Sequence, residues 1–594
     1  MFLITTADQR FWKADEPVLF LGEWCKLFKE KAIWEKLSYE VLPYHLDVRE
    51  KLYQDYLYLD KLYERVLLNL TECLNKIHKT NHNLRYWMII IGPWLASFIT
   101  VLYDRYQSIL RAQELGKVTN TFLAKYEWGA NTPEDFNVFL NRFLNDDFNH
   151  YLYTRIIEFT AKIPFQIPNI DQSENASSCS AKRKDLLTLF KDIGGQTIIF
   201  CQKLLPSRFN GITLVSSYLD TWDLFKLQVS LGQFPYLVPP KVKSPDSNID
   251  RQIREVIFFE PAYNEFERLL LTVIKEQIPK IYLEAYSPMQ QAAFCAYPQK
   301  PKVILTAVAY HTNEAFKFWA AHHVGKGVKL VGIQHGGFYG AGLWFSSEDH
   351  ELRICDRFYT WGWKPENSTI AKPLPAIKLN AIILKAKPKR NGRLLMVLSA
   401  LPRYFYHMYS VYISASGVLS YFEDQYNFVK SLSEENQKLL LVRLYQHDYE
   451  WSQKERWQEK FPKVECYSGP LPILSQLKQS RLCIVTYAGT SYLETLAANF
   501  PTILFWNPKH WELRPQAQSY FDQLRRAGIL YDNSESAAAK VNEICDDPSL
   551  WWEQPNIQAA RARFCGQFAC ISKDWSSVWK KELKRLESQS SPNY

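Results

Sequence analysis

The sequence predicts an α/β protein in which two domains, each built on a parallel sheet, follow one another along the chain. Short β-rich runs alternate with helical stretches over much of the chain, which is the pattern of parallel strands joined by crossover helices. The chain has 594 residues, of which 47% are hydrophobic and 22% are charged, so it is a folded protein too long for one core. We expect a first domain over residues 1–385, a second over residues 386–570, and a helix and tail over residues 571–594.

The first domain is predicted to open with a strand over residues 2–5 and then to carry a large helical insertion. Apolar residues recur at three- and four-residue steps between Leu52 and Leu70, which predicts helix, so we place the insertion at about residues 45–180. A loop is expected at residues 172–183. Residues 365–390, rich in proline and lysine, are predicted to be a linker between the domains. Further strands of the first domain are expected at residues 197–201, 212–216, 302–306, 329–333 and 357–360.

The second domain repeats this alternation, with strands expected at residues 393–399, 438–445, 464–467, 483–486 and 502–506. Its clearest unit is CIVTYAGTSYLETLAANFPTILFW, residues 483–506, which predicts a strand, a turn, a helix and a strand. Gly489, Thr490 and Ser491 lie in the turn, where backbone N–H groups and hydroxyls at a helix N-terminus stabilise an anion. Ser491 and Glu494 also fit a capping box, a purely structural role. The residues alone leave both interpretations open.

Charge and cysteine content restrict the partners and the compartment. The net charge of +9 favours anionic partners such as nucleotide phosphates or an acidic membrane leaflet, but it predicts no nucleic-acid binding. Aromatic residues make up 15% of the chain, which suits surfaces that stack on sugars or face lipid. The eleven cysteines include no CxxC pair, which indicates reduced thiols and a cytoplasmic location. The first residues show no secretory signal.

One apolar segment could contact a membrane. Residues 86–103 carry no charge over 18 positions, at the lower limit for a membrane-spanning helix. Gly92 and Pro93 interrupt the segment. We expect a buried helix, kinked or restarted at Pro93, rather than a spanning helix. Peripheral contact with the inner face of the plasma membrane stays open.

A histidine at the end of one predicted strand is the candidate general base. The strand at residues 329–333 is followed by Gln334, His335, Gly336 and Gly337, and the carboxyl ends of parallel strands are where such sheets bind ligands. An imidazole with a pKa near 6.5 suits removal of a proton from a hydroxyl. The alternative role for His335 is structural, as a side chain that only hydrogen-bonds within the turn.

Polar residues after the first strand are candidates for acceptor binding. Asp8 and Arg10 follow the strand at residues 2–5, and we group them with Gln334, Gly336 and Gly337 as acceptor-binding residues. A helix cap formed by Thr6 or Asp8 would be an ordinary structural alternative.

Three cationic residues of the second domain are candidates for binding a phosphate-containing donor. Arg443 and His447 leave the end of one strand, and Arg403 follows the end of another. Arginine binds phosphate bidentately, so these residues could clamp a diphosphate, although a surface salt bridge would also account for either arginine. Glu348, Glu351 and Asp356 are spaced like a solvated helix face, and we predict no metal site. The chain lacks GxxxxGK[ST], HExxH and GxSxG motifs, so nothing supports a P-loop kinase, a zinc protease or a serine hydrolase.

Several segments together resemble one bacterial family of transferases from O-antigen and surface-carbohydrate gene clusters. They are TADQRFW (6–12), PYHLDVREKL (43–52), RYWMIIIGPWL (85–95), QHGGFYG (334–340), TWGW (360–363), LVRLYQHDYEW (441–451) and YAGTSYLETLAANFPTI (487–503). More distantly, the second half resembles nucleotide-sugar glycosyltransferases with two Rossmann-like domains (GT-B), including capsule, Kdo and teichoic-acid polymerases. The resemblance implies that Arg443, His447, Gly489, Thr490, Ser491 and Glu494 hold the donor and that His335 is the base.

The resemblance implies a glycosyltransferase of surface polysaccharide biosynthesis with a GT-B-like fold. It would move a sugar from a nucleotide-sugar donor to a glycan or lipid-linked acceptor, without a metal or another cofactor. One alternative is a phosphotransferase that uses a CDP-polyol. Another is a non-catalytic member of the same pathway that binds a glycan or serves as a scaffold.

Overall fold

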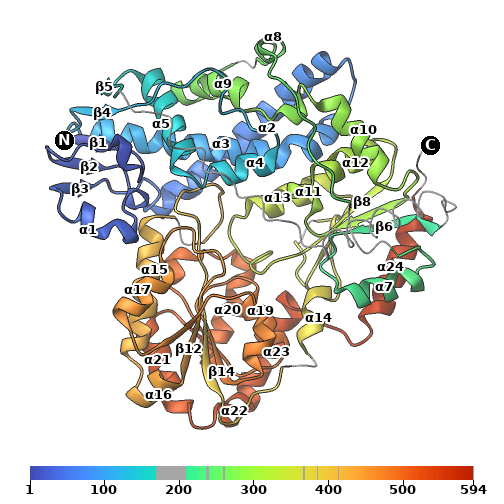
Figure 1. Ribbon diagram of the computed structural model, residues 1–594. Helices are drawn as coiled ribbons and strands as arrows, with labels where there is room; N and C mark the ends of the chain where they lie inside the picture. The colour runs from blue at the N-terminus through green and yellow to red at the C-terminus, as the bar shows by residue number, and fades with distance from the viewer. Residues whose placement is uncertain are drawn as a thin grey trace, which may run out of the picture.

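The computed structural model describes residues 1–168, 209–235, 240–258, 261–365, 368–383, 386–411, 414–590 and 592. These residues form an α/β protein with three parallel sheets, and Figure 1 shows the third sheet below the other two. The predicted α/β class with Rossmann-like domains is therefore confirmed. The predicted first domain, however, contains two separate sheets rather than one. The strand and loop expected at residues 197–201 and 172–183 lie outside the described residues.

The first sheet has the strand order β3-β2-β1-β4-β5. The chain adds β2 and β3 on one side of β1 and then β4 and β5 on the other side, which is the topology of a doubly wound sheet. Its strands are β1 (Phe2–Ile4), β2 (Val18–Phe20), β3 (Tyr39–Val41), β4 (Asn120–Phe122) and β5 (Phe165–Gln166). The helical segments between them are η1 (Gln9–Phe11), η2 (Glu23–Cys25), η3 (Phe28–Glu30), α1 (Lys31–Trp34), α2 (Arg49–His78), α3 (Leu84–Glu114), α4 (Phe136–Arg142) and α5 (Asp146–Thr160).

The helical insertion expected at residues 45–180 is instead part of this first sheet's own connections. Helices α2 and α3 form the crossover from β3 to β4, and α4 and α5 form the crossover from β4 to β5. The periodicity predicted the helices correctly. It missed β4 and β5 because these strands have only three and two residues, too few to show an alternating pattern.

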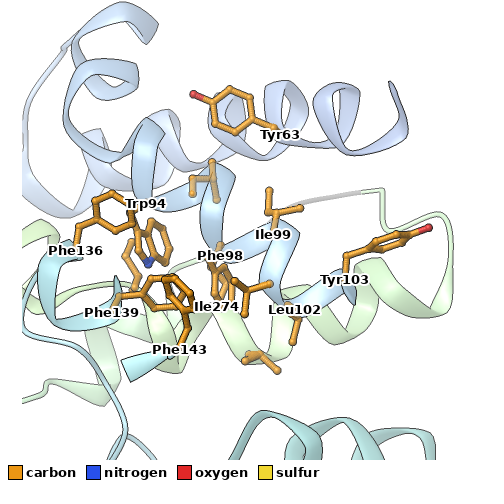
Figure 2. Close-up of a cluster of buried hydrophobic side chains, with 14 of the residues drawn as sticks. Tyr63, Trp94, Phe98, Ile99, Leu102, Tyr103, Phe136, Phe139, Phe143 and Ile274 are labelled. Atoms are coloured by element: carbon orange, nitrogen blue, oxygen red, sulfur yellow. The ribbon is translucent and has the colours of Figure 1, made fainter. Parts of the chain in front are cut away.

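Helix α3 is the apolar segment that the sequence singled out, and it is part of the core. It passes the length and composition test for a membrane span, but 83% of its most apolar window is buried inside the protein. The helix continues through Pro93. Proline has no backbone N–H, so one helical hydrogen bond is absent there, at a cost in stability. Figure 2 shows Trp94 and Phe98 of α3 beside Phe136 and Phe139 of α4. Because protein side chains cover the helix so extensively, its apolar composition is explained by packing alone.

The second sheet has the strand order β10-β9-β8-β7-β6, so each strand pairs with the next one along the chain. Its strands are β6 (Ile212–Val215), β7 (Val303–Thr306), β8 (Lys329–Ile333), β9 (Arg357–Thr360) and β10 (Ala371–Pro373). Its helices are α7 (Thr221–Ser230), α8 (Arg251–Glu255), α9 (Glu265–Gln277), η6 (Lys280–Tyr282), α10 (Tyr286–Ala296), α11 (Ala309–Thr312), α12 (Glu314–Gly325), α13 (Ser346–Ile354) and α14 (Ile377–Ile383). The segment predicted to be a linker therefore contains β10 and α14.

The third sheet has the order β13-β12-β11-β14-β15-β16, again doubly wound. Its strands are β11 (Arg393–Val397), β12 (Leu440–Arg443), β13 (Glu465–Tyr467), β14 (Ser480–Val485), β15 (Thr502–Phe505) and β16 (Leu530–Tyr531). Its helices are α15 (Ser416–Lys430), α16 (Glu434–Leu439), α17 (Gln453–Lys460), α18 (Ile473–Leu477), α19 (Ser491–Ala497), η7 (Pro508–His510), α20 (Pro515–Arg526), α21 (Ser534–Ile544), α22 (Pro548–Trp552) and α23 (Pro555–Phe568). All the strands predicted for this half are present.

The last helix packs against the second sheet rather than the third. Helix α24 (Trp575–Ser588) follows the third sheet in the chain but lies beside α7 at the second sheet (Figure 1). Its Trp579 and Leu583 are buried with residues of that sheet in one hydrophobic cluster. The predicted C-terminal helix therefore fastens the second sheet to the end of the chain.

Candidate functional site

Two glycine-containing turns from different sheets meet at the centre of the site. The turn after β8 touches the turn after β14, where the N–H of Gly337 donates a hydrogen bond to Oγ1 of Thr490 over 3.2 Å. A Cβ atom added at Gly337 would lie 1.7 Å from the carbonyl oxygen of Gly489. Only glycine allows this approach of the two backbones. The structure thus brings the predicted base region and the predicted donor-binding turn into direct contact.

His335 is held by a buried carboxylate in this turn. Its Nε2 lies 2.9 Å from Oε1 of Glu351, a fully buried residue on α13. The hydroxyl of Tyr339 lies 2.6 Å from the same His335 nitrogen and donates to Glu351 over 2.8 Å. His311, on α11 after β7, places its Nε2 3.1 Å from the same carboxylate oxygen. Two imidazoles therefore share one carboxylate at the carboxyl edge of the second sheet.

This arrangement keeps Glu351 ionised despite its burial. Burial opposes ionisation, but the charge of His335 and the hydrogen bonds from His311 and His335 outweigh it and lower the pKa of Glu351 to about 2. A carboxylate on one ring nitrogen orients an imidazole and raises the basicity of the other nitrogen. The side chain of His335 is 20% exposed, so the ring remains accessible to a substrate.

The same three side chains have the composition of a metal site. The ligand atoms of His311, His335 and Glu351 all lie within 4.8 Å of one another, and two histidines with one glutamate can hold a zinc ion. The sequence-based expectation of no metal stays a prediction. The expectation that Glu348 and Glu351 lie on a solvated helix face is wrong, because both are buried. His311 could have been found as His335 was, since it also follows the end of a strand.

Two cations face one carboxylate on the donor side of the contact. Lys378 of α14 donates to the carbonyl oxygen of His335 over 3.1 Å. Arg443, at the end of β12, donates to the carbonyl oxygen of Leu471 over 2.7 Å and to Gln476. Burial raises the pKa of Glu494, while Lys378 and Arg443 oppose that rise. Lys378, which the sequence had placed in a linker, thus joins the predicted residues Arg443 and Glu494 to the His335 turn.

Some predicted residues serve the shape of the turns rather than facing a substrate. The side chain of Gln334 is buried, accepts from the N–H of Trp361 and Nε1 of Trp363, and donates to the carbonyl of Gly336. Its polar atoms therefore brace the turn, and the structure does not support its predicted contact with the acceptor. On the other side, Ser491 bonds to the hydroxyl of Tyr487.

The capping box considered for the start of α19 does not form. Thr490 is the N-cap residue, and it makes no side-chain capping hydrogen bond. The raised pKa of Glu494 comes from burial, with Lys378 and Arg443 as its charged neighbours. Ser491 and Glu494 are therefore not engaged as caps.

The structure places Asp8 and Arg10 at the carboxyl edge of the first sheet, apart from the His335 turn. Arg10 pairs with Asp8 and with Asp147, and Asp8 also accepts from the N–H of Arg10. The capping alternative for Asp8 is therefore realised in η1. These residues contact one another rather than the other predicted acceptor residues.

Arg403 also differs from its predicted position in the cleft. Its side chain is only 2% exposed and pairs with Asp146 over 2.8 Å and with Glu450. It donates a further hydrogen bond to the carbonyl of Trp24. Arg403 thus connects the third sheet to the first, a structural role that leaves its charge compensated.

His447 lies exposed on the loop after β12. Its ring neighbours in the described part of the chain are Tyr445 and Tyr449, each 6.1 Å away and on the same loop. Asp448 accepts from the N–H groups of Ser452 and Gln453, so it shapes this loop instead of orienting the histidine. The structure therefore does not bring His447 to the Arg443 and Glu494 group.

Strained backbone gathers in the loops at these sheet edges. Of the ten described non-glycine residues with positive φ, six follow the carboxyl ends of β6, β8 or β12: Ser216, Tyr218, Phe338, Tyr449, Glu450 and Ser452. Such conformations cost on the order of 1–3 kcal/mol each and cluster at functional sites. The ring of Tyr218 stacks 6.2 Å from His335 and lies 4.6 Å from Nζ of Lys378. Tyr218 and Phe338 thus place strained backbone beside His335, while the other strained residues of the β12 loop lie near His447.

The fold and site define an α/β protein whose parallel sheets present a histidine–carboxylate pair against a cationic, glycine-rich turn. The chain belongs to a transferase family, since the family described as LIC12162 family transferase matches residues 1–583. Comparison with curated proteins gives no match.

Solved structures similar to the chain include a UDP-GlcNAc 2-epimerase from Neisseria meningitidis bound to UDP-GlcNAc, with 11% identity and a TM-score of 0.33 over 67% of this chain and 97% of that one. They also include WaaG, a glycosyltransferase involved in lipopolysaccharide biosynthesis, with 13% identity and a TM-score of 0.26 over 49% of this chain and 87% of that one. At these scores, neither likeness indicates what this chain binds.

Proposed function

We propose that this transferase is a glycosyltransferase of surface polysaccharide biosynthesis. It would move a sugar from a nucleotide-activated donor to a glycan or lipid-linked acceptor. The observation that carries the proposal is the contact between Gly337 and Thr490, because it sets a histidine held by a carboxylate against a turn flanked by two cations. Transfer of a sugar from a phosphate leaving group to a hydroxyl requires a base for the hydroxyl and a group that stabilises the departing phosphate. Here the two lie on opposite sides of one contact.

In the proposed mechanism, His335 removes the proton from the acceptor hydroxyl. Glu351, ionised and hydrogen-bonded to the ring, stabilises the imidazolium that forms. Tyr339 fixes the relative position of the two groups through its hydrogen bonds to both. Because Glu351 is fully buried, no solvent competes for this carboxylate, and His335 stays in one orientation.

The phosphate leaving group would be stabilised by Lys378 and Arg443. Burial lowers the pKa of each of these cations, and Glu494 opposes the change in both. Two cations therefore share a single carboxylate, and an anionic diphosphate would restore the charge balance of the site. This supply of positive charge is why we propose that the reaction needs no metal ion.

A nucleotide screen followed by product analysis tests the proposal. We expect calorimetry to detect binding of at least one of CMP, CDP, UDP and GDP, and mass spectrometry to detect a glycosidic product when the matching nucleotide-sugar and an acceptor are added. Turnover should be unchanged by EDTA. His335→Gln should lower turnover by about two to four powers of ten.

The matched control is His322→Gln, because His322 contacts Phe294 and His323 on α10 and α12, away from the site. Full turnover in His335→Gln would remove the base assignment. Absence of binding to all four nucleotides would favour a scaffold, and a phosphodiester product would favour polyol-phosphate transfer.

A further inference from the structure

A cavity with both polar and apolar walls lies next to the His311 and Glu351 pair, on the side of helix α3. Its volume is about 160 Å³, and its walls come from all three sheet units. Helices α3 and α4 contribute Pro93, Ser97 and Phe136, while the loop after β11 contributes His407 and Tyr409. Figure 2 shows one of these lining residues, Phe136, beside Trp94 in a cluster of buried hydrophobic side chains. A space bounded by three separate units is a common position for a ligand site.

The second sheet supplies the polar side of the same cavity. His311 and Thr312 of α11 line it, as do Ser347 and His350 of α13. Nε2 of His311 also contacts Glu351, and Glu351 contacts His335. The cavity is therefore one side chain away from the proposed base.

Two buried nitrogens at the cavity lack hydrogen-bond partners in the described part of the chain. They are Nε2 of His350 and Nδ1 of His407. His350 is only 8% exposed, and its ring lies close to Gly92, where a Cβ atom would come within 2.8 Å of it. A buried polar atom without a partner costs about 1–3 kcal/mol. Both atoms are covered by other protein atoms, so a ligand in the cavity meets other parts of these two rings.

The chemistry of the walls selects a neutral ligand. The cavity is lined by hydroxyl groups, imidazoles and apolar side chains, with no aspartate, glutamate, lysine or arginine among its lining residues. Burial lowers the pKa of His407 to about 3, so this ring is neutral at pH 7 and can donate or accept a hydrogen bond. A phosphate or carboxylate would find no compensating charge here.

The size of the cavity selects a small ligand. Its volume of about 160 Å³ is well above the roughly 10–15 Å³ that one water molecule needs. It is also below the roughly 300 Å³ at which sites for drug-sized ligands begin. One hydroxylated ring fits these limits, whereas a nucleotide does not.

We propose that this cavity binds a neutral sugar ring of the acceptor, next to the ring whose hydroxyl reacts at His335, with the hydroxyl and imidazole groups of the cavity wall as partners for its hydroxyl groups. The inference rests on the proposed glycosyltransferase function and adds to it the side from which the acceptor enters. The acceptor sugar lies on the α3 side of Glu351, and the donor lies on the side of Thr490 and Arg443. Tyr406 and Tyr409 also line the cavity and add aromatic surface to its wall.

Saturation-transfer NMR on the full-length protein tests this assignment. The probes are glucose, galactose, mannose and N-acetylglucosamine, each measured with and without the nucleotide that binds. We expect a signal from at least one of these sugars and no competition by inorganic phosphate. Ser97→Met, which fills the cavity from α3, should weaken sugar binding by about tenfold or more and leave nucleotide binding unchanged.

Two further variants make the result specific. Ser420→Met makes the same change at an exposed position of α15 and should leave both signals intact. His407→Phe keeps a ring but removes the imidazole nitrogens from a side chain that lines the cavity, so it should weaken sugar binding about three- to tenfold, the value of one hydrogen bond, even if Ser97→Met fails to fold.

The outcomes separate the two proposals. Nucleotide binding without any sugar signal overturns the acceptor site and leaves the proposed function standing. The same holds if phosphate competes, or if His407→Phe binds sugar as tightly as the unaltered protein. Absence of both nucleotide and sugar binding overturns both proposals.

Discussion

The carboxyl edge of the first sheet and the meeting edges of the second and third sheets contain the same kinds of residue but use them differently. At the first edge, Arg10 pairs with Asp8 and Asp147, and Arg403 pairs with Asp146. At the other edges, the hydrogen bonds found for Lys378 and Arg443 go to carbonyl oxygens and to an amide. The charges of the first edge are thus balanced within the protein, while those of the second can serve a ligand.

This comparison shows that a position at the end of a parallel strand does not by itself make a residue functional. The sequence placed Arg10, Arg403 and Arg443 on equal terms because all three follow predicted strands. What distinguishes them is whether a carboxylate from a distant part of the chain neutralises them. We treat the first edge as structural and the second as the proposed site, and three predictions test that difference.

The largest expected effects come from replacing one arginine of each kind, Arg403 and Arg443. Arg403→Met should destabilise the protein by about 1–3 kcal/mol, because the partly buried Asp146 and the carbonyl of Trp24 lose their charged donor, while the folded fraction keeps its turnover. Arg443→Ala should change stability by only about 1 kcal/mol but lower turnover by about two to three powers of ten. Chemical denaturation and the transferase assay measure the two effects. Equal losses of turnover in both variants would contradict the distinction.

The second prediction concerns the contact between the turns. Gly337→Ala would force a Cβ atom to 1.7 Å from the backbone of Gly489, so we expect a loss of about 3 kcal/mol of stability and of most activity. Gly336→Ala is the matched control, because its Cβ would meet no atom closer than 3.7 Å. Thermal unfolding and turnover should separate the two. If Gly337→Ala behaves like Gly336→Ala, the close approach of the sheets is not required.

The smallest effect is the pH dependence contributed by the first edge. Burial lowers the pKa of His150 to about 4, below the roughly 6.5 of the unfolded chain. The unfolded state therefore binds the proton more readily, so this contribution is complete above pH 6.5 and is lost as the pH falls toward 4. The share of His150 in the slope is at most about 1.4 kcal/mol per pH unit, and it adds to that of other histidines whose pKa burial lowers: His322, His323, His350 and His407. Urea unfolding between pH 7 and 5 should show a steeper total slope, and His150→Phe should reduce it by about the share of one histidine.

Glu351→Gln is the comparison variant from the proposed site. The pKa of Glu351 is lowered to about 2, so its contribution is present above the unfolded-state value of about 4.3 and is lost below it. Its replacement should leave the slope between pH 7 and 5 unchanged. A slope that His150→Phe does not alter would show that another group controls acid unfolding.

Much of the fold could be predicted from local pattern. The strands of the third sheet, the helices of residues 45–165 and the burial of α3 follow from apolar periodicity and length. The short strands β4 and β5 could not be predicted, because two or three residues carry too little pattern. Strands β2 and β3 were not predicted either. With only the strand at residues 2–5 predicted, the sequence indicates a helical insertion where the structure has a separate first sheet.

The site was predicted in part. His335, Gly337, Thr490, Arg443 and Glu494 lie together as expected, because glycine turns and strand ends are visible in sequence. Lys378 and Glu351 were missed. Each lies on a helix rather than at a strand end, and its importance comes from a contact with His335 that only the folded chain creates.

The sequence by itself determined the parallel α/β architecture and the two turns that meet, since hydrophobic periodicity and glycine position are local properties. Only the tertiary structure decided which polar residues are compensated, because pairing such as that of Arg403 with Asp146 joins positions 257 residues apart. A charge becomes available to a ligand when the fold leaves it without such a partner, and that outcome is set by packing between sheets.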